Sequence, residues 1–271
     1  MNNTFNINRF GLLLKRQWLD FGKIYLISLL ALTGILVGFY YFNLPKIEEH
    51  NFRWNQFSQV ILSFRLPIFL TFGFIFISVI ASSYFTSLGQ KPKAIMELMV
   101  PASLFEKLLL GIFFTAIVGL ASYLLIFYIV DKTFIIYLDN SWRYQKILNT
   151  ETNLLTQVTY SSIVDDITSE RKLYGFFALP FLTTSIFLLG SVYFNRFHYI
   201  KTAISVMIFI GAASYIIYKS ASLLTRNMVG VHQGSFQNRE DLVFLLIFLV
   251  ITALTLIFWA ITYVRLKEKE V

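Results

Sequence analysis

The sequence predicts an all-α integral membrane protein with six transmembrane helices. Of the 271 residues, 56% are hydrophobic and only 14% are charged, and the mean hydropathy is +0.65; ordinary soluble domains are far less apolar. Six apolar runs are long enough for a helix to cross a hydrocarbon core of about 30 Å, which takes roughly 20 residues. None of the runs breaks into short alternating segments, so helices are favoured over a β-barrel.

The ends of the spans follow from the residues that flank each run. Aromatic side chains such as Tyr40 and Trp259 occur near run ends, where an amphipathic ring prefers the headgroup level. Ser103 and Glu106 stand three apart before an apolar run, which is the capping-box pattern of a helix start. The predicted spans are therefore residues 24–44, 66–88, 104–130, 173–194, 199–218 and 242–264.

The residues before the first span predict an interfacial helix over about residues 5–22. Apolar side chains recur there at helical spacing, with charged side chains on the other side: Ile7, Phe10, Leu14, Trp18 and Phe21. A helix of this pattern can lie on the inner membrane surface. The alternative is a cytoplasmic extension of the first span. The first run lacks the cleavage site of a signal peptide, so it is expected to be retained.

The distribution of lysine and arginine predicts that both termini are cytoplasmic. The basic residues divide almost evenly between the two sides, but the inner segments are much shorter and therefore more densely basic. The largest outer loop is then residues 131–172, for which we expect a solvated loop without a metal site. The net charge of +8 is explained by contact with membrane lipid, and no nucleic-acid partner is expected.

The sequence lacks the residues that several classes of transporter, pore and enzyme require. Away from their ends, the six runs contain no Asp, Glu, Lys, Arg or His, which argues against an ion-coupled transporter or a charged pore. There is no cysteine, no phosphate-binding Gly-rich loop and no paired histidine motif. We therefore predict no catalytic, metal-binding or cofactor-binding residues in this chain, and a lipid-modifying enzyme is disfavoured.

Small residues in two spans predict close helix approach. Gly34 and Gly38 form a Gly-x-x-x-Gly pattern in the first span, and Gly111, Thr115 and Gly119 share a face of the third. The spacing is compatible with packing inside the chain or across a dimer, and packing inside the chain is the favoured interpretation.

The most polar stretch of the first half, residues 89–106, links the second and third spans. Pro92 can start a short helix and Pro101 ends it. In that helix Ile95, Leu98 and Met99 share an apolar face, and Lys91, Lys93 and Glu97 lie mostly elsewhere. Such an element can lie flat on lipid or dock into a partner protein, where Met96 and Met99 would adapt to a groove. The alternative is a solvated connector.

The stretch SSYFTSLGQKPKAIMELMVPASLFEKLLLG resembles the first cytoplasmic link of ABC-2-type permeases, especially those of Bacteroidetes-like bacteria. That group has a Lys-rich turn followed by a Leu-Pro-Ala-Ser-x-x-Glu-Lys motif. The match is carried here by Val100, Pro101, Ala102, Ser103, Glu106 and Lys107, with valine in place of leucine. The opening INRFGLLLKRQWLDFGKIYL also resembles the lead-in helix of the group.

The resemblance implies the membrane subunit of an ATP-binding cassette transporter, usually an exporter, in the bacterial cytoplasmic membrane. It implies a second membrane subunit, identical or different, and a separate ATPase that binds ATP and Mg²⁺, while this chain holds no cofactor. The ATPase-coupling segment is expected to consist of Lys91, Lys93, Ile95, Met96, Glu97, Leu98, Met99, Pro101, Ser103 and Glu106. A membrane scaffold or assembly protein without transport activity is the alternative.

Overall fold

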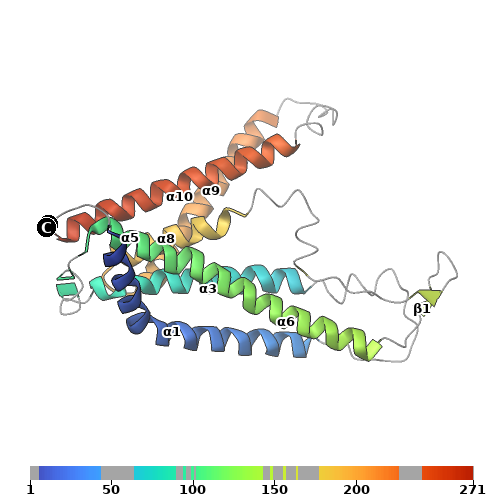
Figure 1. The fold of residues 1–271 in the computed structure, drawn as a ribbon. Helices are drawn as coiled ribbons and strands as arrows, with labels where there is room; N and C mark the ends of the chain where they lie inside the picture. The colour runs from blue at the N-terminus through green and yellow to red at the C-terminus, as the bar shows by residue number, and fades with distance from the viewer. Residues whose placement is uncertain are drawn as a thin grey trace. The chain divides into compact units, whose positions relative to one another are not determined.

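The computed structural model describes residues 6–43, 64–89, 94–95, 99–100, 102–142, 147–148, 155–156, 163, 177–225 and 240–270. The described elements are almost entirely helical (Figure 1). In chain order they are α1 (Ile7–Phe42), α3 (Arg65–Tyr84), the 3-10 helix η1 (Thr86–Gly89), α5 (Leu104–Ile112), the π-helix η2 (Phe113–Val118), α6 (Gly119–Trp142), the antiparallel strands β1 (Ile147–Leu148) and β2 (Leu155–Thr156), α8 (Leu179–Tyr193), α9 (His198–Thr225) and α10 (Glu240–Glu270).

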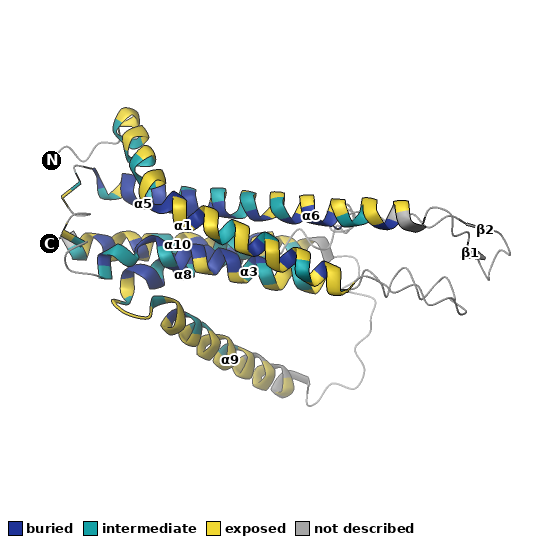
Figure 2. Cartoon of the chain, turned by 90° about the horizontal axis from the view of Figure 1, so that it is seen from below, coloured by how far each residue is buried: buried dark blue, intermediate teal, exposed yellow. Residues whose placement is uncertain are grey.

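Five of these helical stretches are long and apolar enough to cross a membrane: Ile7–Phe42, Arg65–Tyr84, Leu104–Leu138, His198–Ser220 and Leu242–Lys269. Their apolar side chains are largely exposed, and Figure 2 shows α9 as exposed along most of its length. Apolar surface on this scale requires an apolar environment. The predicted helical, multi-pass membrane character is therefore confirmed at this level.

Helix α8 is shorter than the predicted fourth span. It covers only 15 residues, Leu179–Tyr193, or about 22 Å at 1.5 Å per residue. Residues 173–176 lie outside the described residues. Pro180 falls inside the predicted span but occupies the first turn of α8, where a missing backbone N–H removes no helical hydrogen bond.

The predicted interfacial helix and the predicted first span belong to one helix. Helix α1 runs unbroken over 36 residues, Ile7–Phe42, well beyond the roughly 20 that span a bilayer. A continuous helix is compatible both with an interfacial segment and with a helical extension in front of the first span. The apolar face of the lead-in is only partly covered, because Ile7 is 75% exposed and Phe21 is 7% exposed.

The helix that contains the predicted third span starts where the sequence predicts and continues beyond residue 130. Helix α5 begins at Leu104, and helical structure continues through η2 and α6 to Trp142. The first part of the predicted outer loop, residues 131–142, is therefore helical. Asp131 and Lys132 are consequently helical residues, and Asp131 is buried.

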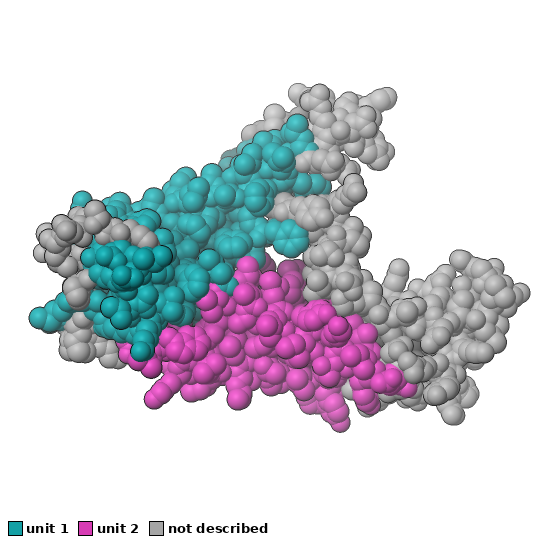
Figure 3. All heavy atoms as spheres, in the orientation of Figure 1, with its two compact units in different colours: residues 1–16, 78–117, 172–271 teal, residues 17–77, 118–171 magenta. Residues whose placement is uncertain are grey.

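The chain divides into two compact units (Figure 3). Unit 1 consists of residues 1–16, 78–117 and 172–271, and unit 2 of residues 17–77 and 118–171. In unit 1, α8 packs against α9 and α10 and buries Leu188 and Val192 completely. Unit 2 has an aromatic core in which the ring centroids of Phe69 and Phe127 are 4.8 Å apart and Tyr123 is 2% exposed.

The glycines predicted to pack helices divide into two groups. A Cβ on Gly34 or Gly38 would meet nothing within 4 Å, so packing of this pair inside the chain, the favoured interpretation, is not found among the described residues. A Cβ on Gly111 would lie 3.1 Å from the Tyr84 ring and 3.2 Å from Phe85, which confirms close approach there. Gly119 is buried in α6.

Candidate functional site

The start of α5 is fixed by the predicted capping box. Ser103 has extended backbone angles, φ −70° and ψ 149°, and its hydroxyl accepts a hydrogen bond from the Glu106 amide at 3.2 Å. In return the Ser103 amide donates to Oε2 of Glu106 at 2.9 Å. Two backbone donors that the helix itself leaves unsatisfied are thereby satisfied reciprocally. The end of the polar link is therefore tied firmly to the third apolar helix.

Glu106 also receives three donors from the N-terminal end of α1. Arg9 donates from Nε to Oε2 at 2.8 Å and from Nη2 to Oε1 at 2.7 Å, a bidentate pair, and the Asn6 amide donates to Oε1 at 2.9 Å. The Glu106 side chain is 0% exposed. These contacts lie within unit 1. Arg9 precedes Glu106 by 97 positions in the chain, and Asn6 precedes it by 100.

The buried position of Glu106 defines its role within the predicted coupling segment. Glu106 was predicted to cap the third apolar helix, and its carboxylate is fully engaged by Ser103, Arg9 and Asn6. It can serve a partner only by holding the link in place. We call these contacts of Glu106 with Ser103, Arg9 and Asn6 the anchor. Because hydrogen bonds to a charged carboxylate are stronger than neutral ones, the anchor is rigid.

The described part of the polar link presents apolar side chains outward. The Met99 amide donates to the Ile95 carbonyl at 2.9 Å, which closes one helical turn. Ile95 is 59% exposed and Met99 is 78% exposed, so two of the three predicted face residues lie a turn apart on an open surface. Ala102, directly before the cap, is buried. Other predicted coupling residues lie outside the described residues: Lys91, Lys93, Met96, Glu97, Leu98 and Pro101.

Removing the Glu106 carboxylate should loosen the first turn of α5. In Glu106→Ala we expect hydrogen exchange of the amides of residues 103–107 to accelerate about tenfold or more, because the Ser103 amide loses its acceptor and a hydrogen bond to a charged group contributes about 1.5–3 kcal/mol. The matched control is Glu268→Ala, which breaks an exposed Arg265–Glu268 pair of 2.6 Å. Unchanged exchange at residues 103–107 in Glu106→Ala would show that the anchor does not hold the link.

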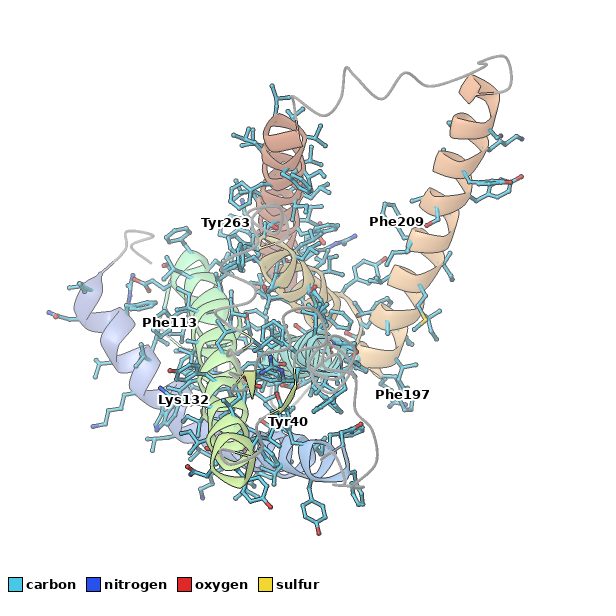
Figure 4. All side chains as sticks on the ribbon, turned by 90° about the vertical axis from the view of Figure 1, so that its right-hand side faces the viewer. Tyr40, Phe113, Lys132, Phe197, Phe209 and Tyr263 are labelled. Atoms are coloured by element: carbon cyan, nitrogen blue, oxygen red, sulfur yellow. The ribbon has the colours of Figure 1, made fainter. Side chains whose placement is uncertain are left out.

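A second polar cluster, which sequence analysis missed, lies in unit 2. Asp131 of α6 accepts from Nη1 of Arg65 at 3.1 Å and from the Tyr40 hydroxyl at 2.8 Å, both at Oδ1, and its Oδ2 accepts from the Ile163 amide at 3.0 Å. Arg65 is 3% exposed and Asp131 1% exposed. Tyr40, labelled in Figure 4, brings α1 into the cluster, so three helices and residue 163 converge on one carboxylate.

The Asp131 cluster corrects one prediction. Asp131 was expected in a solvated outer loop, yet it is helical and buried, as is Arg65, which directly precedes the predicted second span. The start of α3 and the middle of α6 thus carry a buried ion pair, although the interiors of the predicted runs lack charge. Such a pair is tolerated only when further hydrogen bonds satisfy it, as Tyr40 and Ile163 do here.

Neither cluster has the composition of a catalytic or metal centre. Within the described ranges there is no group of three or more His, Asp or Glu side chains that could hold a metal ion. Each of the two clusters instead sets one carboxylate against one arginine, and both connect segments far apart in sequence. Their chemistry is that of fixing helix ends.

Comparisons with protein-family models, with curated proteins and with solved structures found no match.

Proposed function

We propose that this chain is the membrane subunit of an ATP-binding cassette transporter of the ABC-2 type, working as an exporter in the bacterial cytoplasmic membrane. Two membrane subunits, identical or different, assemble with two copies of a separate ATPase that supplies ATP and Mg²⁺ chemistry. The proposal rests first on the resemblance of residues 82–111 to the link of that family. The supporting geometry is a pair of exposed apolar side chains, Ile95 and Met99, next to a buried anchor.

The anchor explains how the link transmits movement. A docking element passes a displacement of the ATPase to the membrane helices only if its connection to them is rigid. The capping box ties residue 103 to α5, and the bidentate Arg9–Glu106 pair ties α5 to the start of α1. A displacement of the link would therefore act on two apolar helices at once.

The proposed topology has six spans with both termini cytoplasmic, and α8 with the residues before it forms the fourth. The chain has no cysteine, so single cysteines can be introduced at Ala94, in the link, and at Ser141, near the end of α6. In intact cells a membrane-impermeant thiol reagent should label Ser141→Cys and leave Ala94→Cys unlabelled until the membrane is opened. Labelling of Ala94→Cys alone would reverse the orientation.

A negative charge introduced at Met99 tests whether the exposed surface of the link binds the ATPase. Met99→Asp should weaken association with the ATPase, because an unpaired carboxylate in an apolar groove costs several kcal/mol when fully buried and less at the rim. Chain folding should persist, since Met99 is 78% exposed. The measurement is the amount of ATPase that copurifies with the tagged chain.

Two variants serve as controls for Met99→Asp. Met99→Leu keeps an apolar side chain and should retain the ATPase. Asn8→Asp adds the same charge at an exposed position in the first turn of α1 and should also retain it. Equal copurification in Met99→Asp and both controls would identify the link as a solvated connector and leave the scaffold alternative.

A further inference from the structure

Three cationic side chains meet at the C-terminal end of α8 in unit 1. The Arg265 guanidinium lies 5.0 Å from the ring centroid of Tyr193, the last residue of α8. Lys201 Nζ lies 5.7 Å from the ring centroid of Phe194, and Lys269 Nζ lies 3.5 Å from Oδ1 of Asn195. Residues from α9 and α10 thus converge on three consecutive positions.

The positive charge at the C-terminal end of α8 exceeds what would balance the partial negative charge of that helix end. Arg196 and Lys267 are exposed nearby in sequence, and the described carboxylate of these segments, Glu268, pairs with Arg265 at 2.6 Å. A helix C-terminus carries only about half a negative charge. Five cations against the two glutamates of these segments, Glu268 and Glu270, leave a surplus that attracts an anion.

The same arginine stands at the end of an apolar groove on α10. The groove, about 400 Å³ in volume, is lined by Ile257, Ala260, Ile261, Val264, Arg265 and Glu268. Its length from Ile257 to Glu268 is about 16 Å at 1.5 Å per residue, close to the thickness of one leaflet, half of about 30 Å. Two buried side chains of α10, Thr262 and Leu266, alternate in sequence with these positions, and α10 packs against α8.

We propose that this groove and the cationic end of α8 bind one anionic phospholipid. An acyl chain lies along Ile257 to Val264, and the phosphate of the headgroup sits at Arg265 and Lys269. Exposed aromatic side chains close in sequence to these cations fit the headgroup region: Tyr193, Phe197 and Tyr263, the last two labelled in Figure 4. The inference requires a membrane but does not require transport.

Trp259, beside the groove in sequence, provides the readout. The chain carries Trp18, Trp54, Trp142 and Trp259, so replacing the first three with Phe leaves one fluorophore. In vesicles, acyl-brominated phosphatidylglycerol should quench Trp259 about 25-fold more effectively per lipid than brominated phosphatidylcholine, because each of the two cations at the phosphate contributes about fivefold in affinity. Inorganic phosphate should not relieve the quenching.

Charge variants locate the site. In the double variant Arg265→Gln/Lys269→Gln, the quenching of Trp259 by the two brominated lipids should differ by no more than about twofold. Lys219→Gln removes a cation from an exposed position at the far end of α9 and should keep the preference. The native chain, purified from an equal mixture of both lipids and analysed for retained lipid, gives the same comparison without Trp replacement.

Three outcomes would overturn the proposal. Equal quenching by both lipids would show that the groove holds ordinary bilayer lipid. Relief of quenching by inorganic phosphate would identify a site for a free anion. No quenching by either lipid would show that protein, such as a second copy of the chain, covers the groove.

Discussion

Replacing Asp131 with alanine should lower the free energy of unfolding by about 3–5 kcal/mol, because it removes the carboxylate that the buried Arg65 faces. Arg65 and Asp131 are 3% and 1% exposed, so water cannot take over the role of the lost carboxylate. The Tyr40 hydroxyl and the Ile163 amide lose their acceptor as well. Unfolding of the purified chain in mild detergent measures the loss.

The double replacement Arg65→Met/Asp131→Leu separates an ion-pair effect from a packing effect. If the buried charge is the source of the loss, removing both charges should recover most of it. Lys132→Ala, on the exposed side of α6, should change stability by less than about 1 kcal/mol. A small effect of Asp131→Ala, similar to that of Lys132→Ala, would show that the cluster is not buried in the native protein.

Gly190→Ala should produce the other large loss, because no space exists for a methyl group between α8 and α9. A Cβ at this position would lie 1.9 Å from Thr202 Oγ1 and 2.9 Å from Thr202 Cβ. Overpacking of this kind costs about 1–3 kcal/mol, and more when the backbone must shift. The measurement is again unfolding in mild detergent.

Gly211→Ala is the matched control for Gly190→Ala. It makes the same change in α9, but a Cβ there would meet nothing within 4 Å. Alanine is also the better helix former by about 1 kcal/mol, so this variant should be as stable as the parent or slightly more stable. Equal destabilisation by both variants would contradict the close contact between α8 and α9.

Local sequence patterns predicted the structural features that depend on residues close together in the chain. The capping box at Ser103 and Glu106 was predictable because its partners are three residues apart and both hydrogen bonds involve the local backbone. The positions of the apolar helices followed from run length in the same way. The full length of α6 was not predicted, because Asp131 marks the end of an apolar run although the helix continues.

Long-range contacts were not predictable from one sequence. The Arg9–Glu106 and Arg65–Asp131 pairs join residues 97 and 66 positions apart, and no local periodicity relates them. The sequence signal for the Arg65–Asp131 pair was the position of its two residues, since Arg65 directly precedes one apolar run and Asp131 directly follows another. Glycine spacing predicted only part of the packing: Gly111 makes a close contact as expected, Gly34 and Gly38 meet nothing within 4 Å, and the close contact of Gly190 with Thr202 was not predicted.

The central claim, a membrane subunit driven by a separate ATPase, is tested most directly by the mass of the native complex. The tagged chain, of 31.5 kDa, is extracted from its own membrane in mild detergent and weighed intact. The account predicts two membrane subunits with two copies of one ATPase that carries a phosphate-binding Gly-rich loop, dissociating when Met99 is replaced by Asp. A complex that contains this chain and no ATPase would contradict the claim.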